Sequence, residues 1–196
     1  MMDSLTKQEE LAATSNVYSL LGRLWLQELD GDLLAKLHSE PLKSAFQFDD
    51  SVQQSDLDSL AAEYCELFVG PKNHFPPMQS VWLEGKLDSE VTASVRAFAD
   101  AVNYQPSSDY PNTLIDHLGI ELEIMGSIVG VLANLAPEDP QLDETQSFAS
   151  EFFGRHLCWT EKLTEAASAK AHSSFYKSLL ANTREFLALE LSRFVV

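Results

Sequence analysis

The stretch LGIELEIMGSIVGVL, residues 118–132, indicates the fold class of this chain. Its apolar side chains recur at alternating steps of four and three positions, which places them on one face of an α-helix. The series consists of Leu118, Leu122, Met125, Val129 and Leu132. Pro137 ends the pattern, because proline lacks the backbone N–H that a continuing helix requires. The stretch therefore predicts a long helix with one face in the core.

The same spacing recurs on both sides of this stretch. The sequence TKQE at 6–9 has the form of a capping box, with Thr6 three positions before Glu9. Apolar residues follow at helical spacing in the ranges 11–25, 57–68, 91–102, 142–157 and 172–194. No alternating pattern of useful length indicates a strand. We expect an all-α helical bundle of about eight or nine helices.

The charge of the chain limits its partners. Thirteen Lys and Arg against thirty Asp and Glu give a net charge of −17 over 196 residues. Such a surface repels phosphate, so we expect no nucleic-acid partner. It attracts a basic partner and speeds its encounter. The alternative is that the charge serves solubility alone.

We expect a cytoplasmic protein. No apolar run approaches the ~20 residues that span a bilayer, and the N-terminus MMDSLTKQEE has no basic start followed by an apolar block. Cys65 and Cys158 sit among apolar helix formers without a CxxC motif. We predict reduced thiols in the core, over a disulfide or a metal site.

The segment YQPSSDYPN, residues 104–112, interrupts the helical pattern. Its Pro, Ser and Asp content predicts a hinge between a lobe of residues 1–103 and a lobe of residues 113–196. One compact domain is the alternative. A short linker between helical lobes also permits domain swapping, so the chain is expected to be a monomer or a domain-swapped dimer.

A second irregular segment, residues 63–87, has the sequence EYCELFVGPKNHFPPMQSVWLEGKL. It begins as a helix and stops at Gly70 and Pro71, and it then carries an unusual number of rings and prolines. Prolines stiffen the chain and reduce the entropy lost on binding, so the segment suits a groove wall for an apolar peptide. The alternative is a rigid connector whose Phe75 and Trp82 fill the core.

His117 and Glu121 lie four positions apart, with Asp116 beside them. This spacing puts the pair on one helix face, where it can bind a metal. A carboxylate metal site in a bundle needs further pairs from facing helices, and no second HxxxE or ExxH occurs. A structural contact or a place in a binding site is the alternative, and we predict no metal. No phosphate-binding glycine loop or nucleophile elbow is present.

These motifs together resemble a known family. YCELFVGP, FPPMQSVW and a downstream DH that opens a long helix are similar to the TorD/DmsD/NarJ-type maturation chaperones of bacterial molybdenum reductases. The tail HLCWTEKL and SSFYKSLLANTREFL is also similar, and the resemblance covers about residues 15 to 190. The matching positions are Tyr64, Leu67, Phe68, Gly70, Pro71, Pro76, Pro77, Ser80, Val81, Trp82, Asp116 and His117. One departure is that Thr113 and Leu114 replace the Glu-Pro that the family places before Asp-His.

The resemblance implies an all-helical, cytoplasmic chaperone that is not an enzyme. Such proteins bind the twin-arginine signal peptide and the catalytic subunit of a molybdenum reductase, and they hold it back from export until its cofactor is inserted. The resemblance implies no resident cofactor, with weak nucleotide binding proposed for some members. It does not identify the reductase. The rivals are a helical-bundle metal-dependent enzyme that uses His117 and Glu121, and a general acidic adaptor.

The sequence then suggests roles within a signal-peptide site. Asp116 and Glu121 are candidate acceptors for the arginine guanidiniums, which favour bidentate carboxylates. His117 is expected to orient Asp116 or to contact the peptide. Ser80 belongs to the same site by resemblance. The apolar wall is assigned to Tyr64, Phe75, Pro76, Pro77 and Trp82.

Overall fold

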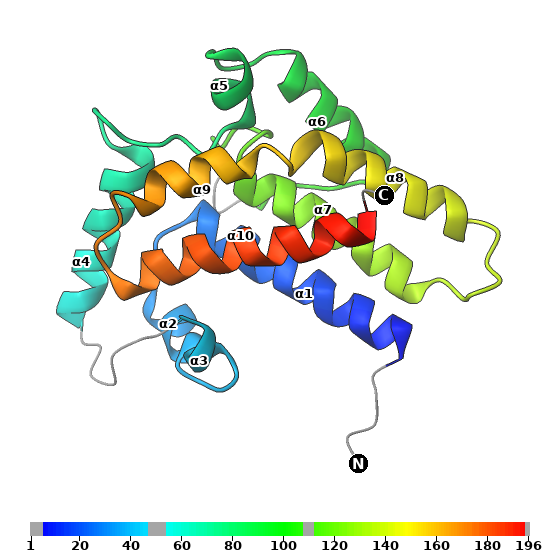
Figure 1. Ribbon diagram of the computed structural model, residues 1–196, viewed down its shortest axis with the longest axis horizontal. Helices are drawn as coiled ribbons and strands as arrows, with labels where there is room; N and C mark the ends of the chain where they lie inside the picture. The colour runs from blue at the N-terminus through cyan, green and yellow to red at the C-terminus, as the bar shows by residue number, and fades with distance from the viewer. Residues whose placement is uncertain (1–5, 47–53, 108–111, 195–196) are drawn as a thin grey trace.

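The protein is described by a computed structural model for residues 6–46, 54–107 and 112–194. These ranges contain ten α-helices, one π-helical turn and no strand, which confirms the all-α prediction with a helix count close to the expected eight or nine. Figure 1 shows their arrangement. The helices are α1 (Lys7–Leu26), α2 (Gly31–Leu37), α3 (Leu42–Phe46), α4 (Gln54–Tyr64), α5 (Gln79–Glu84), α6 (Glu90–Ala101), α7 (Leu118–Asn134), α8 (Leu142–His156), α9 (Thr160–Ser168) and α10 (Ser174–Phe194), and the π-helical turn η1 is Cys65–Val69.

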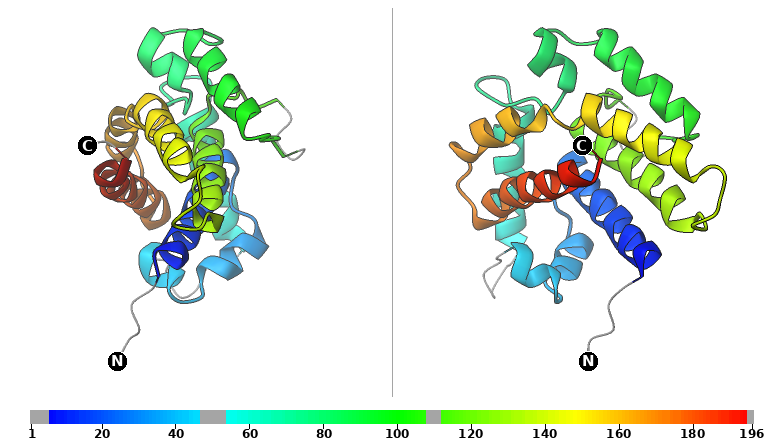
Figure 2. Two further views of the ribbon diagram at one scale, coloured as in Figure 1. Left: turned by 90° about the vertical axis from the view of Figure 1, so that its right-hand side faces the viewer. Right: turned by 45° about the vertical axis from the view of Figure 1, so that its right-hand side comes forward.

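The pair of α1 and α7 forms the centre of the bundle, with α10 and α8 packed beside it (Figures 1 and 2). The capping box of Thr6 and Glu9 starts α1 as the sequence predicted. Glycines let the two helices approach closely. A Cβ on Gly119 would lie 2.7 Å from the carbonyl oxygen of Gly22, and one on Gly126 would lie 3.2 Å from that of Ser15. Any larger residue at these positions forces the helix backbones apart.

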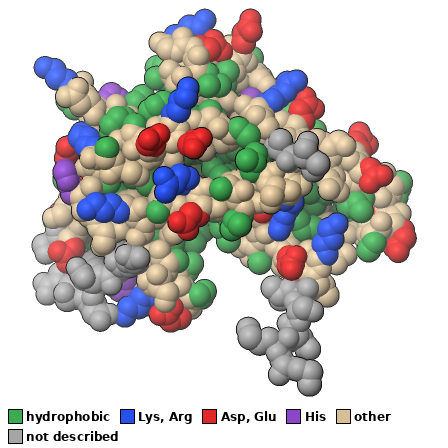
Figure 3. All heavy atoms as spheres, in the orientation of Figure 1, with side chains coloured by type: hydrophobic (Ala, Val, Ile, Leu, Met, Phe, Trp, Pro, Cys, Tyr) green, Lys and Arg blue, Asp and Glu red, His purple; other side chains and the backbone are tan. Residues whose placement is uncertain are grey.

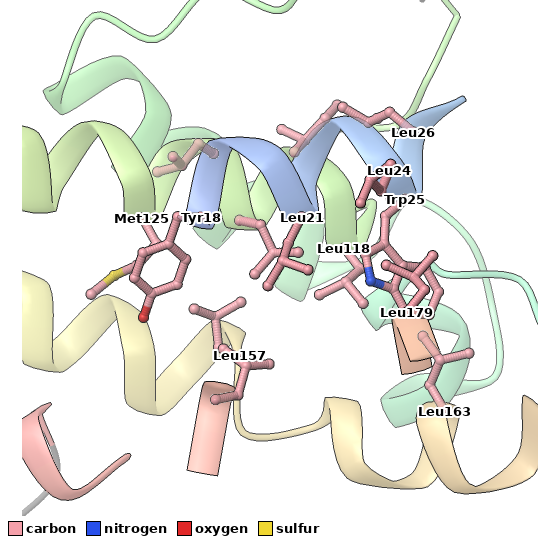
Figure 4. Packing of buried hydrophobic residues seen from close by; sticks show 14 of the residues in the cluster. Tyr18, Leu21, Leu24, Trp25, Leu26, Leu118, Met125, Leu157, Leu163 and Leu179 are labelled. Atoms are coloured by element: carbon pink, nitrogen blue, oxygen red, sulfur yellow. The ribbon is translucent and has the colours of Figure 1, made fainter. Parts of the chain in front are cut away.

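Large apolar side chains fill the space between α1, α7 and α10 (Figure 4). Two buried polar contacts fix how α10 lies against α1. The indole N–H of Trp25 donates to Thr183 Oγ1 at 3.0 Å, and the Tyr18 hydroxyl donates to Glu190 Oε2 at 3.3 Å. These contacts join residues far apart in the sequence and hold the N-terminal and C-terminal helices together.

The predicted hinge falls partly on residues 108–111, which lie outside the described residues. α1, from the first predicted lobe, packs along α7, from the second. The division into lobes stays a prediction. Within the described ranges, no helix has the length and apolar content to span a membrane.

The prediction that both cysteines lie in the core is wrong. Cys65 and Cys158 are free thiols, and both are exposed. Cys65 lies in η1, where its Sγ donates to Glu28 Oε1 at 3.3 Å. The wider π turn changes which side chains face inward, so Leu67 and Phe68 are buried while Cys65 faces solvent.

Candidate functional site: an aromatic and proline segment held by buried polar residues

The segment of residues 69–88 begins with the last residue of η1, contains α5 and leads to α6. Its path is fixed at both ends by backbone geometry. The Phe75 N–H donates to the Leu67 carbonyl at 2.7 Å, and Gly85 ends α5 with φ of 70°, which favours glycine. Figure 1 shows α5 and α6 together at one edge of the molecule, away from α2 and α3. We call this part of the chain the 69–88 segment.

The 69–88 segment is joined to the start of α7 by a short antiparallel bridge between Met78 and His117. The Leu118 N–H donates to the Pro77 carbonyl at 2.7 Å, and the Gln79 N–H donates to the Asp116 carbonyl at 2.9 Å. Two helices, α5 and α7, therefore begin at the same place and satisfy each other's backbone. The structure brings together the two motifs that the sequence placed in one site.

Asp116 stabilises the start of α5 with its side chain as well. Its carboxylate is fully buried, and Oδ2 accepts a hydrogen bond from the Ser80 N–H at 2.9 Å. The first N–H groups of a helix have no partner within the helix, so a carboxylate there replaces one of the missing bonds. Asp116 Oδ1 and Ser80 Oγ have no hydrogen-bond partner among the described residues.

His117 and Glu121 are also buried, next to Asp116. His117 is the N-cap of α7, and its Nδ1 accepts from the Gly119 N–H at 3.0 Å. Burial lowers the pKa of His117 to about 4, so the imidazole is neutral at pH 7. Glu121 Oε2 accepts from the Trp159 indole N–H at 3.0 Å. Burial raises the pKa of Glu121 well above its ordinary value, and the negative Asp116 adds to that rise.

A second polar chain links α5 to α6 and α8. Gln79 Oε1 lies 2.8 Å from Nδ1 of His156, and Nε2 of the same ring lies 3.0 Å from Ser94 Oγ. Because an amide oxygen only accepts, Nδ1 carries the proton and Nε2 accepts from the Ser94 hydroxyl. The Gln79 amide nitrogen donates to the Arg155 carbonyl at 2.6 Å. Burial lowers the pKa of His156 to about 4, which keeps the ring neutral.

Sequence reasoning did not assign Gln79, Ser94, His156 or Trp159 to the site. The signal was present in part, because His156 and Trp159 lie in the HLCW motif and Gln79 lies between Met78 and Ser80 in the proline motif. Their partners come from four different helices, so no local spacing indicates the contacts.

Part of the outer side of the 69–88 segment is apolar. Phe75, Pro76 and Trp82 are half-buried, and the Trp82 indole N–H donates to the Pro76 carbonyl at 2.8 Å. This bond connects the start of the segment to α5 and fixes the indole ring. Leu83 and Leu87 are exposed by 54% and 55%. The rings and the two leucines give the segment an apolar surface that solvent reaches.

The roles assigned to four buried residues need correction. Tyr64 is buried and donates from its hydroxyl to the Trp25 carbonyl at 3.1 Å, so it belongs to the core and not to a groove wall. Asp116 and Glu121 are fully buried, so neither contacts a peptide directly unless α5 moves. Pro77 is buried as well. The described residues contain no group of three or more His, Cys, Asp and Glu suited to a metal ion.

Comparison with known proteins identifies the family to which this chain belongs. Residues 32–165 match the family model described as the nitrate reductase delta subunit. The match covers more than half of the chain, and the chain belongs to this family. The resemblance to the TorD/DmsD/NarJ-type proteins is thereby confirmed.

Two similar proteins are chaperones by name. The chaperone protein TorD of Aliivibrio fischeri (strain ATCC 700601 / ES114) is 24% identical over 136 residues, which are 67% of this chain and 62% of TorD. The chaperone protein YcdY of Escherichia coli (strain K12) is 26% identical over 133 residues, which are 68% of this chain and 64% of YcdY. The matched region thus spans less than two thirds of the length of either relative.

A solved structure supports the same fold over nearly the whole chain. It is a crystal structure from Archaeoglobus fulgidus that is described as a redox enzyme maturation protein. The match covers 96% of this chain and 98% of that chain, with a TM-score of 0.58 and 18% sequence identity.

Proposed function

We propose that this protein is a redox enzyme maturation chaperone that binds the twin-arginine signal peptide of the catalytic subunit of a molybdenum-cofactor reductase. It assists cofactor insertion and assembly before export, and it acts by binding and not by catalysis. Family membership supports the maturation role, and both named relatives are chaperones. A cytoplasmic location follows from the proposal, because the signal peptide is bound before it is exported.

The observation that carries the proposal is the apolar outer side of the 69–88 segment. The described residues include seven large apolar side chains that are exposed, and Val69, Leu83 and Leu87 are three of them. They lie in the same segment as the half-buried Phe75 and Trp82. Contiguous exposed apolar surface marks interaction sites on soluble proteins. The apolar body of a signal peptide fits such a surface.

The charge of the molecule supports the choice of ligand. The twin-arginine head of the peptide carries two guanidiniums, and a protein of net charge −17 attracts them over long range. Carboxylates near α5 reach the surface without any movement, although Glu84 already accepts from the Ser89 hydroxyl at 3.0 Å and lies 3.8 Å from Lys86 Nζ. Glu84 is the last residue of α5, and Asp88 and Glu90 follow it. We assign first contact with the arginines to these surface groups.

The buried polar residues contribute indirectly, because they hold α5 in place. Asp116 holds the N-terminus of α5, and Gln79 ties α5 to His156 on α8. A surface fixed in advance loses less conformational entropy when a peptide binds. We therefore propose that Asp116 and His117 shape the peptide surface from behind, and that α5 must move before either residue contacts an arginine.

Calorimetry with a synthetic twin-arginine signal peptide tests the proposal. The native peptide is expected to bind, and a peptide with both arginines replaced by alanine is expected to bind at least tenfold more weakly, since each charge-assisted contact contributes about 1.5–3 kcal/mol. Equal binding of both peptides would instead favour a general acidic adaptor.

Variants locate the site. Leu83→Ser and Leu87→Ser each remove a half-exposed apolar side chain and are expected to weaken binding by about fivefold, from roughly 1 kcal/mol of lost apolar contact. The matched control is Leu189→Ser on α10, where the leucine is exposed by 71%. Equal losses in all three variants would reject the 69–88 segment as the binding surface.

A further inference from the structure

A second surface feature lies at the other end of α6, away from α5. The end of α6, the second half of α7 and the first turns of α8 enclose an open hollow of about 480 Å³. Its apolar lining includes Val102, Ile128, Val131 and Phe148. Val131 is exposed by 48%, which is high for a large apolar side chain. Figures 1 and 2 show these three helices running side by side towards this end.

The rim of the hollow is polar and negatively charged. Glu144 lines it from the first turn of α8, Gln141 from the N-cap of that helix, and Asn103 from two residues beyond the end of α6. Asp143 is exposed beside Glu144, and Asp100 is exposed one residue before the lining residue Ala101. A ligand that enters the hollow therefore meets the carboxylate of Glu144, with two further carboxylates one residue from the lining.

Acidic residues outnumber basic residues in the sequence that forms the hollow. Residues 97–154 contain ten Asp and Glu and no Lys or Arg, although they form more than a quarter of the sequence. In Figure 3 the right-hand end of the molecule, where α7 leads into α8, carries acidic side chains. The hollow thus lies in an acidic part of the sequence, with Glu144 in its lining and Asp100 and Asp143 one residue away from lining residues.

We infer that this hollow binds a cationic amphipathic segment of a partner protein. The apolar side of the segment packs on Val102, Ile128 and Phe148, and its Lys or Arg side chains face Glu144, Asp143 and Asp100. An apolar lining alone would bind any apolar segment, and acidic residues alone would attract any cation. The combination selects a segment that is apolar on one side and basic on the other.

Other occupants fit this surface less well. Nucleic acid and anionic lipid carry negative charge, which the carboxylates repel. A second copy of the chain would bring its own charge of −17 to the contact. The inference does not depend on the proposed signal-peptide function, because the hollow shares no lining residue with the 69–88 segment.

The test uses a defined probe: a fluorescein-labelled 14-residue peptide of lysine and leucine, with the leucines on one helical face. Anisotropy against the full chain is expected to show binding that weakens as salt rises. A second peptide of equal charge, with alanine in place of leucine, is expected to bind at least tenfold more weakly.

Two variants and two matched controls locate the binding. Val131→Ser is expected to weaken binding by about five- to tenfold, and Glu144→Gln by about two- to fivefold. The controls remove an exposed leucine and an exposed glutamate elsewhere: Leu189→Ser on α10 and Glu165→Gln on α9. All four positions are at least partly open to solvent, so none of these changes should unfold the chain. The controls are expected to change affinity by less than twofold.

Methyl chemical shifts give an independent readout of the same binding. The peptide is expected to shift the resonances of Val102, Ile128 and Val131 first. Shifts that begin in the 69–88 segment would overturn the inference. Equal losses in the variants and their controls would do the same, because the attraction would then be a property of the whole charged surface.

Discussion

Replacing Asp116 by alanine tests the central contact of the candidate site. The substitution removes the carboxylate that accepts from the Ser80 N–H at 2.9 Å, and it leaves that N–H buried without a partner. Hydrogen bonds to charged groups contribute about 1.5–3 kcal/mol to stability. We therefore expect the free energy of unfolding to fall by about 1.5–3 kcal/mol, and Asp116→Asn, which keeps an acceptor oxygen, to cost about half as much.

The location of the loss matters more than its size. Amide hydrogen exchange of the peptide fragment that covers α5 should accelerate, because the N-terminus of α5 loses its cap. The matched control is Asp30→Ala, since Asp30 accepts from the Leu33 N–H at 2.7 Å at the exposed start of α2. The control is expected to cost about 1 kcal/mol and to accelerate exchange in α2 alone.

Two results would contradict this account of Asp116. If α5 keeps its protection in Asp116→Ala, the carboxylate does not hold the helix. If signal-peptide binding is lost while α5 keeps its protection, Asp116 contacts the peptide directly, as the sequence first suggested.

Three further changes have defined outcomes. Gly119→Ala places a Cβ 2.5 Å from a Leu26 side-chain carbon and should lower the free energy of unfolding by about 1–3 kcal/mol. The control Gly154→Ala has no atom within 4 Å of its Cβ and should raise the free energy of unfolding by about 0.5–1 kcal/mol. Chemical denaturation measures both changes, and equal effects would reject close packing of α1 and α7. His117 has a folded pKa of about 4, below its ordinary 6.5, so the stability from its neutral form is complete above pH 6.5 and is lost as pH falls towards 4. In His117→Asn this loss of about 3 kcal/mol should disappear from the pH dependence of the free energy of unfolding. An unchanged pH profile would assign the loss to other groups. The thiol of Cys65 is exposed and should react with a thiol reagent in the native protein. The reaction should be slow at pH 7, because partial desolvation of the thiol and its hydrogen bond to Glu28 raise its pKa. Reaction only after unfolding would contradict the exposure of Cys65.

Local patterns in the sequence predicted the helices well. The apolar spacing of residues 118–132 corresponds to α7, and the capping box of Thr6 and Glu9 marks the start of α1. The last helix was expected from about residue 172 to Phe194, and α10 is Ser174–Phe194. These features depend on residues three or four positions apart, so a single sequence contains the information.

The candidate site was predicted only in part. The Pro76-Pro77 and Asp116-His117 motifs do meet, yet Asp116 caps α5, which lies 36 positions away along the chain, and not its own helix. An Asp before a helix is ordinarily read as a cap for that helix. The pairing across the bundle is tertiary, and no local rule contains it. The apolar pattern of residues 57–68 included Tyr64, but the bond from its hydroxyl to a carbonyl of α1 is also tertiary, and the sequence assigned the ring to a groove wall instead.

The joining of Pro77 to Leu118 and of Ser80 to Asp116 has a consequence for synthesis of the chain. While the ribosome makes residues 79–84, the carboxylate that caps α5 does not yet exist. The helix stays without its anchor until residue 116 has left the ribosome and α7 has begun to dock on α1. A nascent chain that stops before that point lacks these two anchors of the 69–88 segment, so the apolar surface of the segment takes its final form only once the central helices are in place.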